Sequence, residues 1–105
     1  MKQDNNNCQD LGNLMAIKLH NGYTILVRSP YQHRTDSYRL FFYLQKKGIR
    51  HVFEIDDPSN KLSCPKNRRS ENIRRLIAGF VEERLKTGYF LPYMQEFEEE
   101  LKEAI

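Results

Sequence analysis

Lysine and arginine side chains in the middle of the chain are the residues best suited to chemistry, because they can bind phosphate. The chain has 105 residues and a formal net charge of +3, but the charge is unevenly placed. Residues 28–75 carry twelve Lys/Arg against five Asp/Glu, which is +7, whereas residues 76–105 carry three against seven, which is −4. Clustered cations release counterions on binding nucleic acid, so the middle segment predicts a phosphate-binding face. Its candidate ligands are Lys46, Lys47, Arg50, Lys66, Arg68, Arg69, Arg74 and Arg75.

A second candidate site for anions lies between a predicted strand and a predicted helix. Free backbone N–H groups and the helix dipole attract anions at a helix N-terminus. The candidate ligands are Arg28, Ser29, His33 and Arg34. The alternative is a polar loop in which Asp36 or Ser37 only caps the helix.

Patterns for catalysis or metal binding do not emerge from the sequence. The histidines and cysteines lack the paired spacing of a zinc site. Asp56 and Asp57 with Glu54 offer carboxylates for a divalent cation, but Asp57 to Asn60 has the composition of a turn. No Ser/His/Asp or Cys/His arrangement can be assembled, so an enzyme is the least favoured class and no cofactor is predicted.

The cysteine content and hydropathy bear on the compartment. Two cysteines, Cys8 and Cys64, are too few for a disulfide scaffold and predict reduced thiols in a cytoplasmic protein. The sequence contains no long apolar run and no pattern of a secretion signal, so it predicts no membrane partner.

The first predicted element is a hairpin around Asn21-Gly22. These residues separate two β-rich runs and are typical of a two-residue type I′ turn, which would pair Ile17 with Leu26. The second run, residues 23–28, is apolar on both faces and is therefore predicted to be the inner strand. Residues 1–13 are polar and predict a flexible tail, and residues 14–105 predict a single domain.

The segment around residues 38–57 has two interpretations. Helical spacing, the N-capping residues before it and Gly48 after it favour a helix over Ser37–Lys47. Followed by a strand at residues 51–55, this helix would complete one right-handed βαβ unit with parallel strands. The alternative is a strand that turns at Gly48 into a hairpin. We favour the helix, because such a strand would be apolar on both faces.

Two helices are predicted in the C-terminal third. Ser70 is expected to cap the first, in which Ile73, Ile77 and Val81 follow helical spacing, and Pro92 begins the second. The predicted fold class is therefore α+β, with a small mixed sheet, made of an N-terminal β-hairpin and one βαβ unit, covered by two C-terminal helices.

Two functions compete at this point. The basic middle predicts a small nucleic-acid-associated protein that contacts the phosphate backbone. Under the strand interpretation the chain also resembles the sheet-plus-helix DNA readers found in recombinase arm domains. The alternative is a protein-interaction module, such as a regulator, inhibitor or subunit, since polarised charge also steers association between proteins or between two copies of the chain. A continuous basic face would favour the first, and an exposed apolar patch the second.

Overall fold

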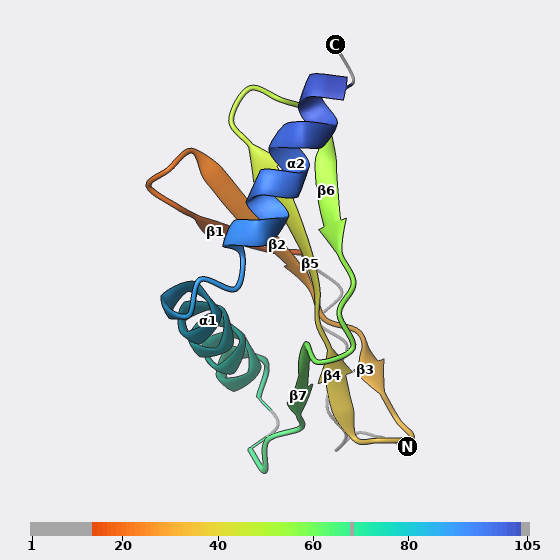
Figure 1. Ribbon diagram of the computed structural model, residues 1–105. Helices are drawn as coiled ribbons and strands as arrows, with labels where there is room; N and C mark the ends of the chain where they lie inside the picture. Colours follow the sequence, from red (N-terminus) through yellow and green to blue (C-terminus); the bar gives the residue numbers. More distant parts are fainter. Residues whose placement is uncertain (1–13, 68, 104–105) are drawn as a thin grey trace.

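An α+β arrangement of short strands followed by two helices is seen in the computed structural model, which describes residues 14–67 and 69–103 (Figure 1). The strands are β1 (Met15–Lys18), β2 (Tyr23–Arg28), β3 (Tyr31–Gln32), β4 (Ser37–Arg39), β5 (Phe41–Lys46), β6 (Val52–Ile55) and β7 (Lys61–Ser63). The helices are α1 (Ser70–Lys86) and α2 (Leu91–Glu103). The α+β class and the two C-terminal helices are confirmed. The tail predicted at residues 1–13 lies outside the described residues.

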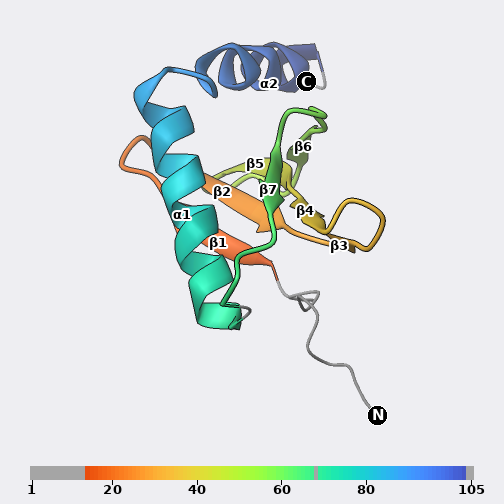
Figure 2. The ribbon, with the colours of Figure 1, turned by 90° about the horizontal axis from the view of Figure 1, so that it is seen from below.

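A long antiparallel ribbon organises both sheets. In its first half β2 pairs with β5, Arg28 facing Phe41, and in its second half β3 pairs with β4, Tyr31 facing Tyr38. The backbone N–H of Arg39 donates to the carbonyl of Pro30 at 3.0 Å, so the pairing continues between the two halves. The first half belongs to a four-stranded sheet of order β1-β2-β5-β6, and the second half to a three-stranded sheet of order β3-β4-β7. Figure 2 shows the second half extending away from both helices.

The helix predicted over Ser37–Lys47 is wrong, because β4 and β5 occupy this segment. Phe42 and Leu44 are fully buried, whereas Phe41 and Tyr43 are half-buried, which is the alternation of a strand. The strand interpretation is correct, and β5 pairs antiparallel with β6. The predicted βαβ unit and its parallel strands are therefore wrong as well, since every described strand pair is antiparallel. A strand that is apolar on both faces does not need burial on both, because one face of β5 accommodates half-buried aromatic rings.

The β1–β2 hairpin is present, but its register differs by one residue from the prediction. Leu19 N–H donates to the Tyr23 carbonyl at 2.8 Å, which closes a loop of residues 20–22 instead of a two-residue turn. Ile17 consequently pairs with Ile25 rather than with Leu26. A shift by one residue moves a side chain to the opposite face of a strand, and the observed register places Ile17 on the side of the core. As predicted, β2 is an inner strand and β1 lies at the edge.

The turn conformation depends on Gly22, whose φ is +91°. We expect Gly22→Val to lower the free energy of unfolding by about 1–3 kcal/mol, because a β-branched residue is strained at this φ. Urea denaturation measures the change. Gly79→Ala in α1 is the control, since a Cβ there meets no atom within 4 Å. It should raise stability by up to about 1 kcal/mol. An unchanged stability of Gly22→Val would contradict the turn geometry.

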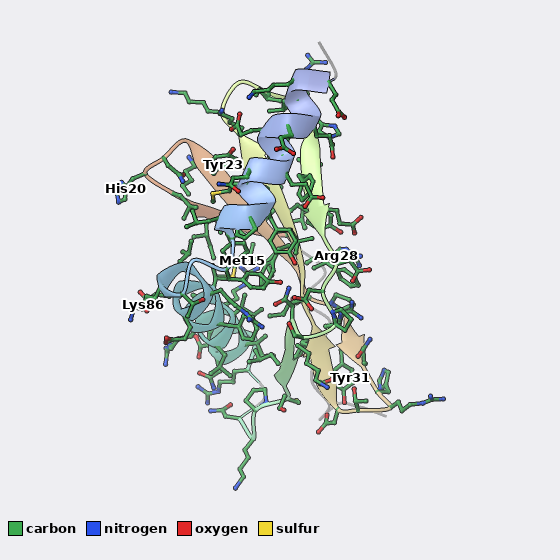
Figure 3. The ribbon with its side chains drawn as sticks, in the orientation of Figure 1. Met15, His20, Tyr23, Arg28, Tyr31 and Lys86 are labelled. Carbon is green, nitrogen blue, oxygen red and sulfur yellow. The ribbon has the colours of Figure 1, made fainter. Side chains whose placement is uncertain are left out.

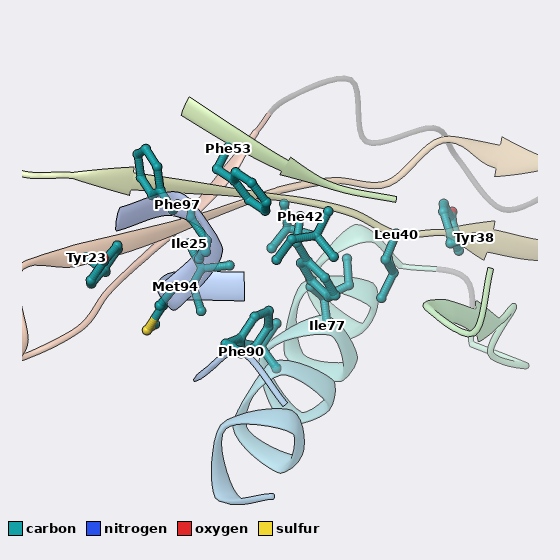
Figure 4. Packing of buried hydrophobic residues seen from close by; sticks show 14 of the residues in the cluster. Tyr23, Ile25, Tyr38, Leu40, Phe42, Phe53, Ile77, Phe90, Met94 and Phe97 are labelled. Atoms are coloured by element: carbon teal, nitrogen blue, oxygen red, sulfur yellow. The ribbon is translucent and has the colours of Figure 1, made fainter. Parts of the chain in front are cut away.

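Both helices cover one face of the four-stranded sheet, and the core lies between this face and the helices (Figure 4). The buried sheet residues all point to this face. Phe42 occupies its middle, with its ring centroid 5.4 Å from that of Phe90 and 6.3 Å from that of Phe80. From the helices the core receives Ile73, Ile77, Val81, Met94 and Phe97.

Arg69, not Ser70, stands at the N-cap position of α1, and it makes no side-chain capping bond. Neither described helix has the length and hydropathy needed to cross a bilayer.

Candidate functional site

The side of the four-stranded sheet that faces away from the helices is the candidate site, and we call it the open face. Strand alternation directs every second side chain of β2 and β5 to it. These side chains are Thr24, Leu26, Arg28, Phe41, Tyr43 and Gln45. Only Arg28 of this set was a predicted ligand. The polar and aromatic types were visible in the sequence, but their common face depends on the pairing of two strands that are far apart in the chain.

Arginine and aromatic side chains are held together at the end of the open face where β2 ends and β5 begins. The guanidinium of Arg28 lies 4.4 Å from the ring centroid of Phe41, and its Nε donates to the hydroxyl of Tyr43 at 3.2 Å. Arg39 lies over the same Phe41 ring at 4.9 Å and forms an ion pair with Asp56. Planar groups are therefore fixed in orientation on this face, because each guanidinium is anchored to a ring or a polar partner.

A hollow of about 440 Å³ lies at one end of the open face, where it meets the β5–β6 turn. Thr24 and Gln45 line it from the sheet, and the turn contributes Lys46, Lys47, Gly48, Ile49 and Arg50. Three of the predicted phosphate ligands are thus brought together beside the open face. A neighbouring hollow of about 360 Å³ adds Lys18 next to Thr24 and Lys47. We call the region formed by Lys18, Thr24, Gln45, Lys47 and Arg50 the basic end.

Lys46 differs from the other turn cations because it holds α2. Its Nζ lies 2.7 Å from a carboxylate oxygen of Glu98, which also accepts a hydrogen bond from the Tyr23 hydroxyl. These two contacts hold the pKa of Glu98 below its usual range. Burial, together with the hydrogen bond to Glu98, raises the pKa of Tyr23 to about 12. Lys47 and Arg50 are exposed and form no ion pair with any described residue, so they are the turn cations available to a ligand.

The remaining predicted phosphate ligands lie elsewhere. Lys66, Arg69, Arg74 and Arg75 lie before α1 or in its first turns, at the end of the molecule opposite to the β5–β6 turn (Figure 1). Arg69 is highly exposed and lies 3.6 Å from Glu71. Arg68 lies outside the described residues. The seven predicted ligands that lie in the described part of the chain therefore do not form one continuous face, because they lie at opposite ends of the molecule (Figure 1).

The predicted anion site loses its physical basis, because the strand β4, and not a helix, begins at Ser37. Arg28 lies at the end of β2, whereas His33 and Arg34 belong to the tip of the ribbon. Figure 3 shows Arg28 well apart from Tyr31, whose ring contacts His33 with a centroid distance of 4.6 Å. Ser29 is buried, with 4% of its surface exposed. The structure thus divides the four predicted ligands between two places.

A polar cluster ties the β6–β7 turn to the connection between the helices. The Tyr89 hydroxyl donates to Asp57 at 2.7 Å and accepts from the Asn60 amide at 3.0 Å. The bond from Tyr89 holds the pKa of Asp57 below its usual range, and burial raises the pKa of Tyr89. Arg84 donates to Ser59 in the same turn. The cluster confirms the predicted turn. In the described part of the chain no group of three or more His, Cys, Asp or Glu residues could hold a metal ion.

Cys64 departs from the expectation of a reduced thiol, because it is disulfide-bonded. Cys8, the other cysteine of the sequence, lies outside the described residues.

Comparisons of the chain with protein-family models, curated proteins and solved structures find no match. The assignment of a function therefore depends on the chemistry of the site alone.

Proposed function

We propose that the protein binds nucleic acid at the basic end, with Lys47 and Arg50 contacting phosphate groups. The observation that carries this proposal is the hollow in which these two cations meet Thr24 and Gln45. Lys and Arg supply the charge that binds phosphate, and Thr and Gln are common hydrogen-bonding partners of phosphate oxygens and base edges. Cations and hydrogen-bonding groups at one end of a sheet face are a suitable combination for a polyanion that carries bases.

The position of α2 favours approach from the side of the open face. This helix contains five glutamates and one lysine, and it packs on the opposite face of the sheet through Met94 and Phe97. Its negative charge repels a polyanion on that side. Glu98 and Glu100 are already engaged with Lys46 and His51. A nucleic acid that reaches Lys47 and Arg50 is therefore directed over Thr24 and Gln45.

A salt titration of the double variant Lys47→Gln/Arg50→Gln tests the proposal. Fluorescence anisotropy with labelled oligonucleotides gives the binding constant at each salt concentration. Loss of two phosphate contacts should lower the slope of log K against log salt by about 1.4 on single strands and about 1.8 on duplex, because each phosphate contributes about 0.7 or 0.9. All sequences should be weakened alike, since phosphate contacts carry no sequence information.

The matched control is Arg74→Gln/Arg75→Gln, which removes the same charge at the start of α1. A clearly smaller effect of this variant is expected if the basic end is the binding surface. An equal or larger effect would move the site to the cations before α1 and in its first turns, Lys66, Arg69, Arg74 and Arg75, which we call the α1 group. Wild-type protein that binds no oligonucleotide at low salt would overturn the function. Circular dichroism checks that both variants are folded.

A protein-interaction module is the second candidate function, and one observation favours it. The open face contains an apolar hollow of about 320 Å³ lined by Leu14, Leu26, Arg28, Tyr43 and Val52. Leu14 is 54% exposed and Val52 is 39% exposed. Exposed apolar patches mark contacts with other molecules. With this function the protein would act as a regulator, inhibitor or subunit, and it would not bind oligonucleotides.

A further inference from the structure

The apolar hollow is continuous with the basic end along the strands. Gln45 pairs with Val52 on one side and with Thr24 on the other, and the next pair on the same face is Leu26 with Tyr43. Two residues along a strand span about 7 Å. This distance corresponds to about two nucleotides at the 3.4 Å spacing of one strand of B-form DNA. Lys47 lies two residues beyond Gln45, so about 14 Å separates it from Tyr43 along the strand direction. A chain whose phosphate lies at Lys47 therefore passes Gln45 and places a base about four nucleotides further along within reach of Tyr43.

The chemistry of the hollow suits the flat face of a nucleobase. Tyr43 supplies an aromatic ring, and Arg28 supplies a guanidinium whose position is fixed by Tyr43 and Phe41. Bases in single strands stack on aromatic rings and on arginine planes. Leu26 and Val52 add aliphatic walls. The hollow offers few groups that distinguish one base edge from another, so it suits stacking that tolerates any sequence.

A duplex fits this surface poorly for two reasons. The faces of its bases are stacked on each other and are not available to Tyr43. The open face also belongs to a sheet of four strands. Four strands about 4.8 Å apart span about 14 Å, whereas the major groove is about 12 Å wide and admits a two-stranded ribbon. The open face is therefore wider than the groove it would have to enter.

We infer that the apolar hollow receives a base of a single-stranded nucleic acid whose phosphates lie at the basic end. This inference rests on the proposed function and specifies its ligand class. Tyr43 is the base-stacking residue, and Lys47 and Arg50 provide the phosphate contacts.

The test compares three labelled probes of equal length at one salt concentration: a mixed-sequence DNA single strand, the corresponding duplex, and a single strand of abasic residues. Wild-type protein should bind the single strand about fivefold or more tightly than the abasic strand, because stacking of a base contributes at least that factor. It should also prefer the single strand to the duplex. Tyr43→Leu keeps the hollow apolar and should lose this preference, and Tyr43→Phe keeps the ring and should retain it.

The outcomes separate this inference from the proposed function. Equal affinity for the single strand and the abasic strand would overturn the inference, while sensitivity to Lys47→Gln/Arg50→Gln would keep the phosphate site. Tighter binding of the duplex would also overturn it, and so would a Tyr43→Leu variant with wild-type preference. Absence of binding to all three probes at low salt would overturn both and leave the hollow to a protein partner. The abasic comparison uses wild-type protein, so it holds even if a Tyr43 variant fails to fold.

Discussion

Phe42→Ala is expected to lower the free energy of unfolding by about 3–5 kcal/mol. The side chain is fully buried in the middle of the sheet, and its ring contacts Phe80 of α1 and Phe90 of the connection between the helices. Removal of the ring leaves a cavity where the sheet meets α1 and the connection between the helices. Urea denaturation followed by circular dichroism measures the loss.

The neighbouring substitution Phe41→Ala is the matched control. Phe41 lies on the open face, where it is half-buried under Arg28 and Arg39. Its loss should cost about 1 kcal/mol, the centre of the range for ordinary substitutions. Similar losses for the two variants would contradict the alternation of β5, since a helix would have placed both rings on one apolar face.

Phe97→Ala should remove the main anchor of α2, again with a loss of about 3–5 kcal/mol. Phe97 is fully buried, and its ring centroid lies 6.1 Å from that of Tyr23 and 5.8 Å from that of Phe53. The ion pair between Lys46 and Glu98 lies next to this contact and depends on the docked helix. Hydrogen exchange should therefore accelerate throughout α2 and more than in β2 and β5.

Leu91→Ala in the first turn of α2 provides the comparison. Leu91 is 59% exposed, so its truncation should change stability by no more than about 0.5 kcal/mol. Unchanged exchange of α2 in Phe97→Ala would show that the polar contacts of Lys46 and His51 hold the helix by themselves.

Periodicity predicted the helices well and the central strands poorly, for a physical reason. Ile73, Ile77 and Val81 recur at helical spacing because α1 has one buried stripe, and all three are buried. β5 carries large apolar side chains on both faces, so its sequence has no clear period of two. Its open face accommodates Phe41 and Tyr43 because Arg28 packs against them, and that contact arises only from strand pairing.

The candidate site was predictable in its charges but not in its assembly. Lys46, Lys47 and Arg50 were recognised from the clustering of cations along the sequence. Nearness in sequence does not imply a shared surface, and the residues of the α1 group lie at the other end of the molecule. Thr24 and Gln45 lie in different strands, and only the β2–β5 register shows that they face each other.

The long ribbon bears on the order in which the chain folds. In the four-stranded sheet each strand pairs with a neighbour that is next to it along the chain or is connected through the tip of the ribbon. The loops that must close are therefore short, and short loops cost little entropy. All four strands lie within residues 15–55, ahead of both helices. During synthesis from the N-terminus, the complete sheet can pair before α1 leaves the ribosome, and the helices then dock onto a face that already exists.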